Sequence, residues 1–265
     1  MSQLVRPELQ GRAEYGRPIL RFVTDLKFFS LISQRAVWFS RLGALQDQFE
    51  GSIPPPTKRR LQAESRRWDH VFPDPAHRRQ LREAADDNES SGRSVLAVNC
   101  WFADDTETPE MWETYVGSTE GVAIESSCEL LAENLVHQEY ARIGLVRYVD
   151  FEQEDMGLYL GNQAIERAFL KRPQFAAERE LRIATMNIVG PGCLNADGTP
   201  PSQQQLAGPG MFDPDRPGFF VRANVGGLLR AVRLAPGASE SFATAVRKAV
   251  AAAGLSFTVR RSCLE

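Results

Sequence analysis

Charged and apolar residues alternate from Glu178 to Ile183, in the order Glu-Arg-Glu-Leu-Arg-Ile. Successive side chains of a β-strand point to opposite faces, so this alternation predicts a strand that buries Leu181 and Ile183. Glu178, Glu180 and Arg182 then share the opposite face. Two carboxylates beside an arginine are able to bind a sugar hydroxyl or stabilise a developing positive charge. A solvated strand face with local ion pairs explains the same pattern, and both interpretations stay open.

The length and composition of the chain favour one globular domain. Its 265 residues are enough to bury a full hydrophobic core, so we expect a single domain over residues 1–265. The net charge of −3 argues against a surface built for nucleic acid or anionic membrane. The four cysteines are far apart and the three histidines show no ligand spacing to them, so neither a disulfide framework nor a metal site is expected. Without an apolar leader or a run of about 18 apolar residues, the chain is predicted to be cytoplasmic.

Local patterns predict helices and strands in an irregular order. This order is typical of an α+β fold with mixed, mostly antiparallel sheets and flanking helices. The expected strands cover residues 18–23, 36–40, 95–102, 121–126, 144–151, 180–187, 219–223, 228–234 and 256–260. The expected helices cover residues 25–33, 109–115, 127–135, 154–171 and 239–253. In the first helix, the spacing of Leu26, Phe29 and Ile32 predicts a buried stripe, with Thr24 as the cap.

Two long segments interrupt this order. Residues 57–90 predict a polar helical insertion, broken near Pro73 and Pro75. Within it, residues 58–82 are rich in Lys and Arg, which suits a contact with nucleic acid or an acidic protein but equally an ordinary salt-bridged surface. Residues 189–218 are rich in Gly, Pro, Asn and Gln and predict a long surface loop, placed to act as a lid.

Several short motifs follow one another along the chain. They are Val37-Trp38-Phe39-Ser40, Asp47-Gln48-Phe49-Glu50, Cys100-Trp101-Phe102, Met111-Trp112-Glu113-Thr114-Tyr115 and Glu178-Arg179-Glu180-Leu181-Arg182. In order and spacing they resemble a widespread bacterial domain family of unknown function, over about residues 18–260. The chain departs from the family pattern at Gln46 and Gln48, where Asn and Pro are usual, and at Ala103, where Ser is usual.

A second resemblance rests on three sites far apart in the sequence. Arg21 lies in a predicted strand that is followed by Thr24 and a helix. Trp112 and Tyr115 lie near the middle of the chain, and the Glu-x-Glu pair lies on a late strand. In this order the sites resemble those of mono-ADP-ribosyltransferases, enzymes that use NAD as a substrate. The resemblance implies an ADP-ribosyltransferase-like fold.

The resemblance also implies a role for each residue. Glu180 is expected to stabilise the ribose cation that forms when nicotinamide leaves, and Glu178 to orient or deprotonate the acceptor. The residues expected to bind NAD are Arg21, Thr24, Trp112, Tyr115 and Arg182. The structural alternatives are an ion pair from Arg21 to Glu50 or Glu178, and core packing of the two aromatic residues.

The combined expectation is an NAD-dependent mono-ADP-ribosyltransferase, a transferase that acts as a bacterial toxin or in phage defence. Its acceptor is a protein or a nucleic acid, an antitoxin or immunity protein is an expected partner, and no membrane is expected to be involved. One alternative is a non-catalytic binding module on the same fold. Another is a metal-dependent nuclease that uses Asp104, Asp105 and Glu107. An NAD site requires Arg21 and Glu180 to lie on the same face of the sheet and to line one pocket with Tyr115.

Overall fold

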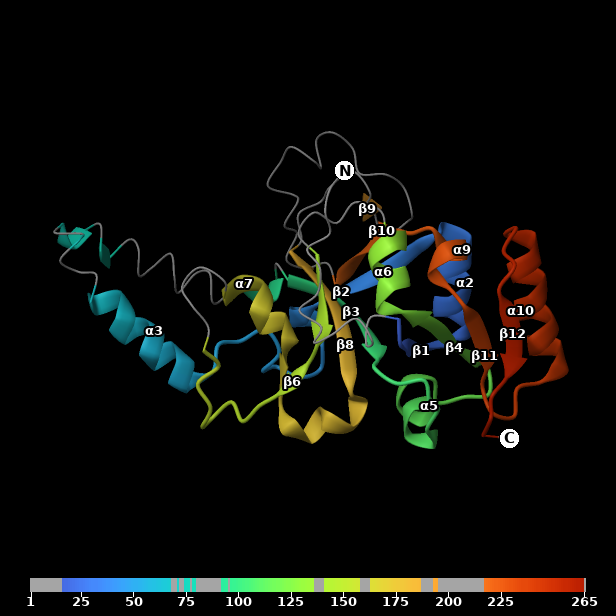
Figure 1. Ribbon diagram of the computed structural model, residues 1–265, viewed down its shortest axis with the longest axis horizontal. Helices are drawn as coiled ribbons and strands as arrows, with labels where there is room; N and C mark the ends of the chain where they lie inside the picture. Colours follow the sequence, from blue (N-terminus) through green and yellow to red (C-terminus); the bar gives the residue numbers. More distant parts are fainter. Residues whose placement is uncertain are drawn as a thin grey trace.

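The structure is a computed structural model of the chain. It describes residues 16–67, 71, 74–76, 78–79, 92–94, 96–135, 141–157, 163–186, 193–194 and 217–264. Within these residues, a large sheet is covered by helices on both of its faces (Figure 1). The expectation of a mixed α and β protein with a mostly antiparallel sheet and flanking helices is confirmed in this form.

Ten strands form the large sheet. They are β1 (Pro18–Thr24), β2 (Ala36–Arg41), β3 (Leu96–Phe102), β4 (Gly121–Ser127), β5 (Arg142–Leu145), β8 (Glu180–Met186), β9 (Cys193–Leu194), β10 (Gly218–Arg222), β11 (Ala231–Leu234) and β12 (Thr258–Arg261). Their order is β12-β11-β4-β1-β3-β2-β10-β9, and β8 pairs with β3 and β5 beside this path. Every described pairing in this sheet is antiparallel except that of β11 with β12. A separate parallel pair joins β6 (Arg147–Tyr148) to β7 (Leu170–Lys171).

Most of the described helices lie against the large sheet, and the helix over residues 55–67 extends away from it (Figure 1). The helices are α2 (Asp25–Gln34), α3 (Pro55–Arg67), α5 (Pro109–Tyr115), α6 (Cys128–Asn134), α7 (Gln163–Glu166), α9 (Val225–Leu228) and α10 (Glu240–Ala252). Three short 3₁₀ helices are η1 (Leu42–Ala44), η2 (Arg167–Phe169) and η3 (Pro173–Glu178). The main core joins α2, α6, α9 and α10 to one face of the sheet, whereas α5 packs against the opposite face.

Helix starts agree with their local sequence signals. The hydroxyls of Thr108, Ser127 and Ser239 each accept a hydrogen bond from the backbone N–H three residues later. Such caps satisfy N–H groups that the first turn of a helix leaves without a partner. The predicted helices near residues 109, 127 and 239 are confirmed.

The first helix buries a different face from the one predicted. Phe28, Leu31 and Ile32 are buried, whereas Leu26 is 76% exposed. The prediction is therefore right for Ile32 but wrong for Leu26, because a spacing of three residues falls short of the 3.6-residue turn and drifts around the helix. The predicted capping hydrogen bond of Thr24 is not formed.

Two longer predictions in the middle of the chain are also wrong. Residues 154–171 do not form one helix, since their described parts contain α7, η2 and the short strand β7. Ala168, Phe169 and Leu170 are all buried, so this stretch has no solvent face of the kind a surface helix would show. The strand expected over 144–151 is split into β5 and β6.

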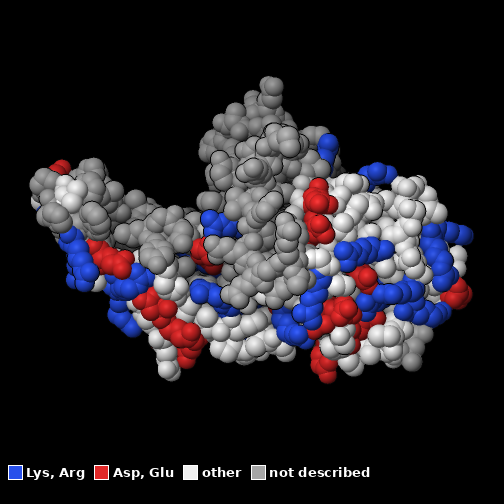
Figure 2. All heavy atoms as spheres, viewed as in Figure 1, with Lys and Arg blue, Asp and Glu red and all other residues white. Residues whose placement is uncertain are grey.

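Only parts of the two predicted insertions are described. Figure 2 shows basic and acidic side chains interleaved along α3, and Arg60 of this helix pairs with Glu64 and Asp155. This part of the basic segment is a salt-bridged surface. Of residues 189–218 the structure describes only 193–194 and 217–218, and Cys193 and Leu194 form a strand rather than a loop. The remaining residues of the predicted lid lie outside the described part of the chain.

Candidate functional site

The strands β1 and β2 separate as they follow the same edge of β3. The one described pairing of β1 with β3 is at Phe102, whereas β2 pairs with β3 at Val98 and Ala97. Between these points the side-chain amide of Asn99 donates a 2.9 Å hydrogen bond to the carbonyl oxygen of Trp38. A side-chain hydrogen bond therefore takes the place of backbone pairing between β2 and β3 at this point, and the sheet opens between β1 and β2.

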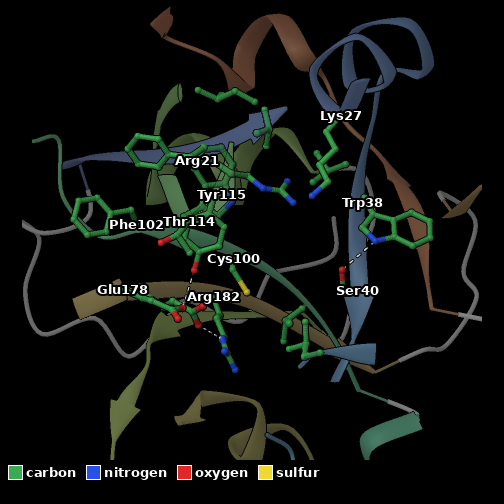
Figure 3. Close-up of a pocket in the computed structure, with 18 of the residues that line it drawn as sticks. Arg21, Lys27, Trp38, Ser40, Cys100, Phe102, Thr114, Tyr115, Glu178 and Arg182 are labelled. Carbon is green, nitrogen blue, oxygen red and sulfur yellow. Dashed lines mark hydrogen bonds and ion pairs between the residues drawn. The ribbon is translucent and has the colours of Figure 1, made fainter. Parts of the chain in front are cut away.

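A pocket of about 690 Å³ lies at this separation (Figure 3). Its volume is in the range of sites that hold a cofactor or a drug-sized ligand. Arg21 enters it from β1 and Trp38 from β2. Tyr115 reaches it from α5 and faces Glu178 (Figure 3), and Glu180 also lines the pocket.

The two carboxylates of the Glu-x-Glu pair come from different elements. Glu178 is the last residue of η3 and Glu180 is the first of β8. Arg179 between them has a left-handed backbone, with φ of 41°. The prediction that both glutamates lie on one strand is wrong, because this turn separates Glu178 from the strand. Both carboxylates nevertheless reach the same ammonium group, that of Lys171.

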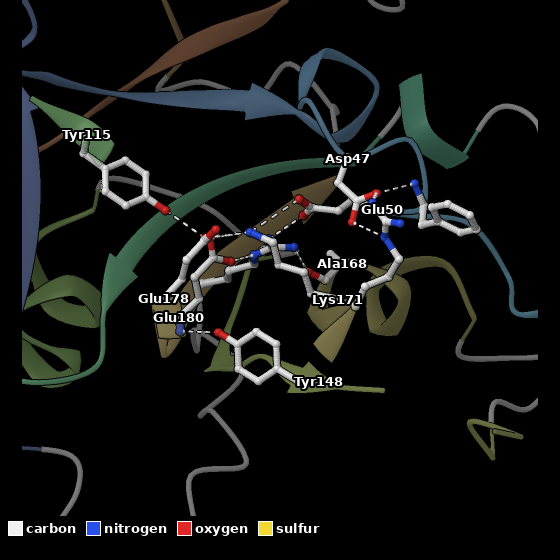
Figure 4. A network of polar contacts seen from close by, with 11 residues as sticks. Asp47, Glu50, Tyr115, Tyr148, Ala168, Lys171, Glu178 and Glu180 are labelled. Carbon is white, nitrogen blue, oxygen red and sulfur yellow. Dashed lines mark hydrogen bonds and ion pairs between the residues drawn. The ribbon is translucent and has the colours of Figure 1, made fainter. Parts of the chain in front are cut away.

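These carboxylates belong to a buried group of charges that we name the carboxylate cluster (Figure 4). Its members are Glu50, Lys171, Glu178, Glu180 and Arg182. The Lys171 Nζ lies 2.7 Å from Glu178 Oε2, 3.2 Å from Glu180 Oε1 and 3.6 Å from Glu50 Oε1. The Arg182 Nε lies 2.5 Å from Glu180 Oε2, and its guanidinium also pairs with Glu50. Three carboxylates and two cations leave the cluster with one net negative charge.

Burial rules out a solvated strand face. The side chain of Glu178 is 18% exposed, whereas that of Lys171 is 6% exposed and that of Arg182 is fully buried. Buried charges are costly unless they are paired and hydrogen-bonded, as they are here. The alternative interpretation of the Glu-x-Glu-x-Arg pattern as an exposed surface row is therefore wrong.

Two tyrosines connect the cluster to its surroundings. The Tyr115 hydroxyl donates a 2.8 Å hydrogen bond to Glu178 Oε2. The hydroxyl of Tyr148 accepts one of 2.8 Å from the backbone N–H of Glu180. Burial, together with the negative charge of Glu178, raises the pKa of Tyr115, so its hydroxyl stays protonated and acts as a donor.

The two carboxylates of the pair have opposite acid–base character. Burial and the neighbouring Glu180 raise the pKa of Glu178, although Lys171 acts in the other direction. Burial also opposes ionisation of Glu180, but Arg182 and Lys171 outweigh it and hold the pKa of that carboxyl below its ordinary value. Glu180 is therefore a firmly ionised group, and Glu178 is the more basic of the two.

Arg21 differs from the cluster because its charge is not paired. No described residue forms a hydrogen bond or an ion pair with its half-buried guanidinium, whose Cζ lies 6.0 Å from the centroid of the Trp101 ring. Burial lowers the pKa of Arg21 to about 10. The alternative ion pairs to Glu50 and Glu178 are not formed. An uncompensated cation that faces a pocket suits an anionic ligand.

Arg21 and Glu180 reach the pocket from opposite faces of the sheet. By strand alternation, Arg21 shares the face of Ile19 and Val23, which pack in the main core with Leu181. Glu180 points away from that core. One pocket contains both side chains because β1 and β2 separate over β3. The expectation that Arg21, Tyr115 and Glu180 line a single pocket is confirmed, whereas the expectation that Arg21 and Glu180 share one face of the sheet is wrong.

Two residues expected to bind NAD lie outside the pocket wall. The Trp112 ring is buried, packs edge-on against Phe22 at 4.9 Å, and donates from Nε1 to Glu107 Oε2 at 3.1 Å. Core packing thus describes Trp112. Thr24 precedes α2 and does not line the pocket, whereas Arg182 lines it from within the carboxylate cluster.

Sequence reasoning did not assign a role to several residues of this pocket. Trp38 and Ser40 line it from β2, where they alternate with the buried Val37 and Phe39. This alternation was a usable signal. No local signal marks Lys171, whose neighbours in the sequence do not distinguish it from a surface lysine.

The acidic residues near the end of β3 do not form a metal site. Asp104 pairs with Arg179 at 2.6 Å, and Glu107 is buried against Arg233 at 3.0 Å. Among the described residues, no group of three or more His, Cys, Asp or Glu side chains is placed to hold a metal ion. The cluster required by the nuclease alternative is therefore not formed by Asp104, Asp105 and Glu107.

A scan of the chain against protein-family models finds no match, and a search of curated proteins finds no relative. Both resemblances drawn from the motifs therefore stay predictions. No helix in the described segments has the length and apolar character needed to cross a membrane.

Proposed function

We propose that the chain is an NAD-dependent ADP-ribosyltransferase-like enzyme and that NAD binds in the pocket between β1 and β2. One observation carries the proposal: the unpaired Arg21 guanidinium and the carboxylate cluster occupy two ends of the same pocket. NAD has an anionic diphosphate and a cationic nicotinamide ring. A pocket with opposite charges at its two ends complements both parts of such a molecule.

Glu178 is the carboxylate best placed to meet the ribose. Its side chain is more exposed than that of Glu180, at 18% against 6%. Both oxygens of Glu180 already accept hydrogen bonds, from Lys171 and Arg182. No described residue donates a hydrogen bond to Oε1 of Glu178. The proposal therefore exchanges the roles expected from the sequence, in which Glu180 meets the ribose cation.

The proposed reaction uses the charge of the cluster directly. The bond between C1′ of the ribose and the nicotinamide nitrogen breaks, and its electron pair leaves with nicotinamide. The Glu178 carboxylate and the net negative charge of the cluster stabilise the resulting oxocarbenium-like cation. The acceptor then bonds to C1′ and its proton passes to Glu178, whose raised pKa suits a proton acceptor.

Other pocket residues suit the remainder of NAD. Arg21 is able to bind a phosphate oxygen pair through its planar guanidinium. Trp38, which packs edge-on against Phe220 at 4.9 Å, offers a rigid aromatic face for a base or for the nicotinamide ring.

The experiment follows nicotinamide release and label transfer separately, with purified protein, labelled NAD and cell extract as the source of acceptor. We expect Glu178→Gln to lower nicotinamide release by about two to three orders of magnitude. Glu113→Gln is the matched control, because Glu113 is exposed on α5. Equal release by the wild type and Glu178→Gln, or no release by the wild type, would overturn the proposal.

A second candidate is a binding module without catalysis. The mutual pairing of Glu50, Glu180, Lys171 and Arg182 favours it, since such a network also serves a purely structural purpose. If the chain is a binding module, NAD should raise the melting temperature of the protein without any release of nicotinamide.

A further inference from the structure

Among the residues that the structure describes, Lys171 is the cation that pairs with all three carboxylates of the carboxylate cluster. Its ammonium has three donors, and it lies near the carboxylates of the Glu178 and Glu180 pair and of the distant Glu50. The side chain is 6% exposed, and the Phe175 ring lies 4.6 Å from the Nζ. The position of this charge is therefore determined on every side.

Lys171 and Tyr115 hold the same oxygen of Glu178. Their donors lie 2.7 Å and 2.8 Å from Oε2, respectively. Glu178 ends η3 and precedes the left-handed Arg179, so its side chain is not aligned by the ladder of β8. The contacts at Oε2 orient the carboxylate instead, and no described residue donates a hydrogen bond to its Oε1.

Resting on the proposed function, we infer that Lys171 is a positioning residue that holds Glu178 by Oε2 and keeps Oε1 available to the ribose of NAD. Lys171 acts through Glu178 and does not itself need to touch the substrate. Its neutral replacement removes the ammonium that pairs with both Glu178 and Glu180, so the two neighbouring carboxylates lose the cation that they share.

The groups around Glu178 set the direction of the expected change. Tyr115 from α5 is a neutral donor, Glu180 from β8 is negative, and Lys171 from β7 is the cation in direct contact. On β3, burial and the negative charge of Glu180 raise the pKa of the Cys100 thiol to about 12, so it stays uncharged. Loss of Lys171 must therefore make Glu178 take up a proton at higher pH.

The first measurement is an NMR titration of the Glu178 side-chain carboxyl in the full chain, assigned by its absence in Glu178→Gln. We expect Lys171→Met to raise the apparent pKa of Glu178 by about one to two units, the size expected for loss of a charge-assisted hydrogen bond. Lys248→Met, which removes an exposed lysine of α10, should leave it unchanged.

The second measurement is the pH profile of nicotinamide release. In Lys171→Met the acid limb of the profile should move to higher pH by as many units as the pKa of Glu178. The value of kcat near neutral pH should fall, while KM for NAD changes little. Lys171→Arg keeps a cation, so its acid limb and its kcat should both lie closer to the wild-type values than those of Lys171→Met. If the wild type released no nicotinamide, the proposed function would fail, but the titration would still decide the role of Lys171.

A third variant covers the case in which Lys171→Met does not fold. The double variant Lys171→Met with Glu50→Gln returns the cluster to one net negative charge, since one cation and one carboxylate are both removed. It still lacks the hydrogen bond to Glu178 and should show the same upward shift. An unchanged titration of Glu178 in Lys171→Met, or in the double variant where Lys171→Met does not fold, would overturn the inference.

Discussion

The hydroxyl of Tyr115 donates a 2.8 Å hydrogen bond to the carboxylate of Glu178, which lies 63 residues later in the chain. This bond joins α5 to the carboxylate cluster. Trp112, which lies one turn earlier on the same helix, donates a hydrogen bond to the buried Glu107 and so helps to hold α5 in place. The orientation of Glu178 therefore depends on packing that lies outside the pocket as well as on Lys171.

Tyr115→Phe tests this link. The variant keeps the ring but removes one of the two donors to Glu178 Oε2. We expect nicotinamide release to fall about tenfold and the free energy of unfolding to fall by about 1 kcal/mol, as for the loss of one hydrogen bond. Kinetics and urea unfolding on the same preparation measure both. Unchanged release would mean that Tyr115 does not orient Glu178.

Glu178→Gln and Glu180→Gln should separate catalysis from stability. Glu180→Gln leaves Arg182 and Lys171 buried with a weaker partner, so the free energy of unfolding should fall by about 3 kcal/mol. Glu178→Gln should change it by less than about 1 kcal/mol, because the amide oxygen still accepts from Tyr115. Chemical denaturation provides the comparison, and equal losses in the two variants would contradict this assignment.

Arg21→Met should weaken binding without weakening the fold. Removal of an unpaired half-buried charge should leave the free energy of unfolding unchanged or increase it slightly. We expect KM for NAD to rise at least about tenfold with little change in kcat, since a phosphate contact is lost. Arg222→Met, at an exposed position of β10, is the matched control. A loss of stability above about 2 kcal/mol would point to a structural role for Arg21.

Acid unfolding should report on Glu107. Burial opposes its ionisation, but hydrogen bonds from Ser262, Arg233 and Trp112 outweigh this and lower its pKa. A carboxyl whose pKa is lower in the folded state contributes stability that is complete above its unfolded pKa of about 4.3 and is lost as the pH falls through the folded value.

The melting temperature of the wild type should therefore fall steeply below about pH 5. Glu107→Gln should have a lower melting temperature than the wild type at pH 7, but its melting temperature should fall less than that of the wild type on acidification. Thermal scans from neutral to acidic pH measure both curves, and parallel curves would show that Glu107 does not contribute to the acid transition.

The elements that were predicted correctly have their signals within a few residues. Thr108 and Pro109 mark the start of α5, and Ser239 marks that of α10. Caps act on backbone groups two or three positions away, so the sequence around them is sufficient. The stretch over 154–171 has no such end signals, and tertiary packing decided its structure.

The sequence alone predicted one pocket for Arg21, Tyr115 and the Glu-x-Glu pair, because the types and order of these residues resemble those of NAD-using transferases. It did not determine how those charges are used. Lys171 becomes the centre of the cluster only when β7 lies beside η3 and β8, and Arg21, which no described residue pairs with, reaches the pocket where β1 and β2 separate. The energy of a charge depends on its burial and on distances to residues remote in the chain, and only the tertiary structure sets these quantities.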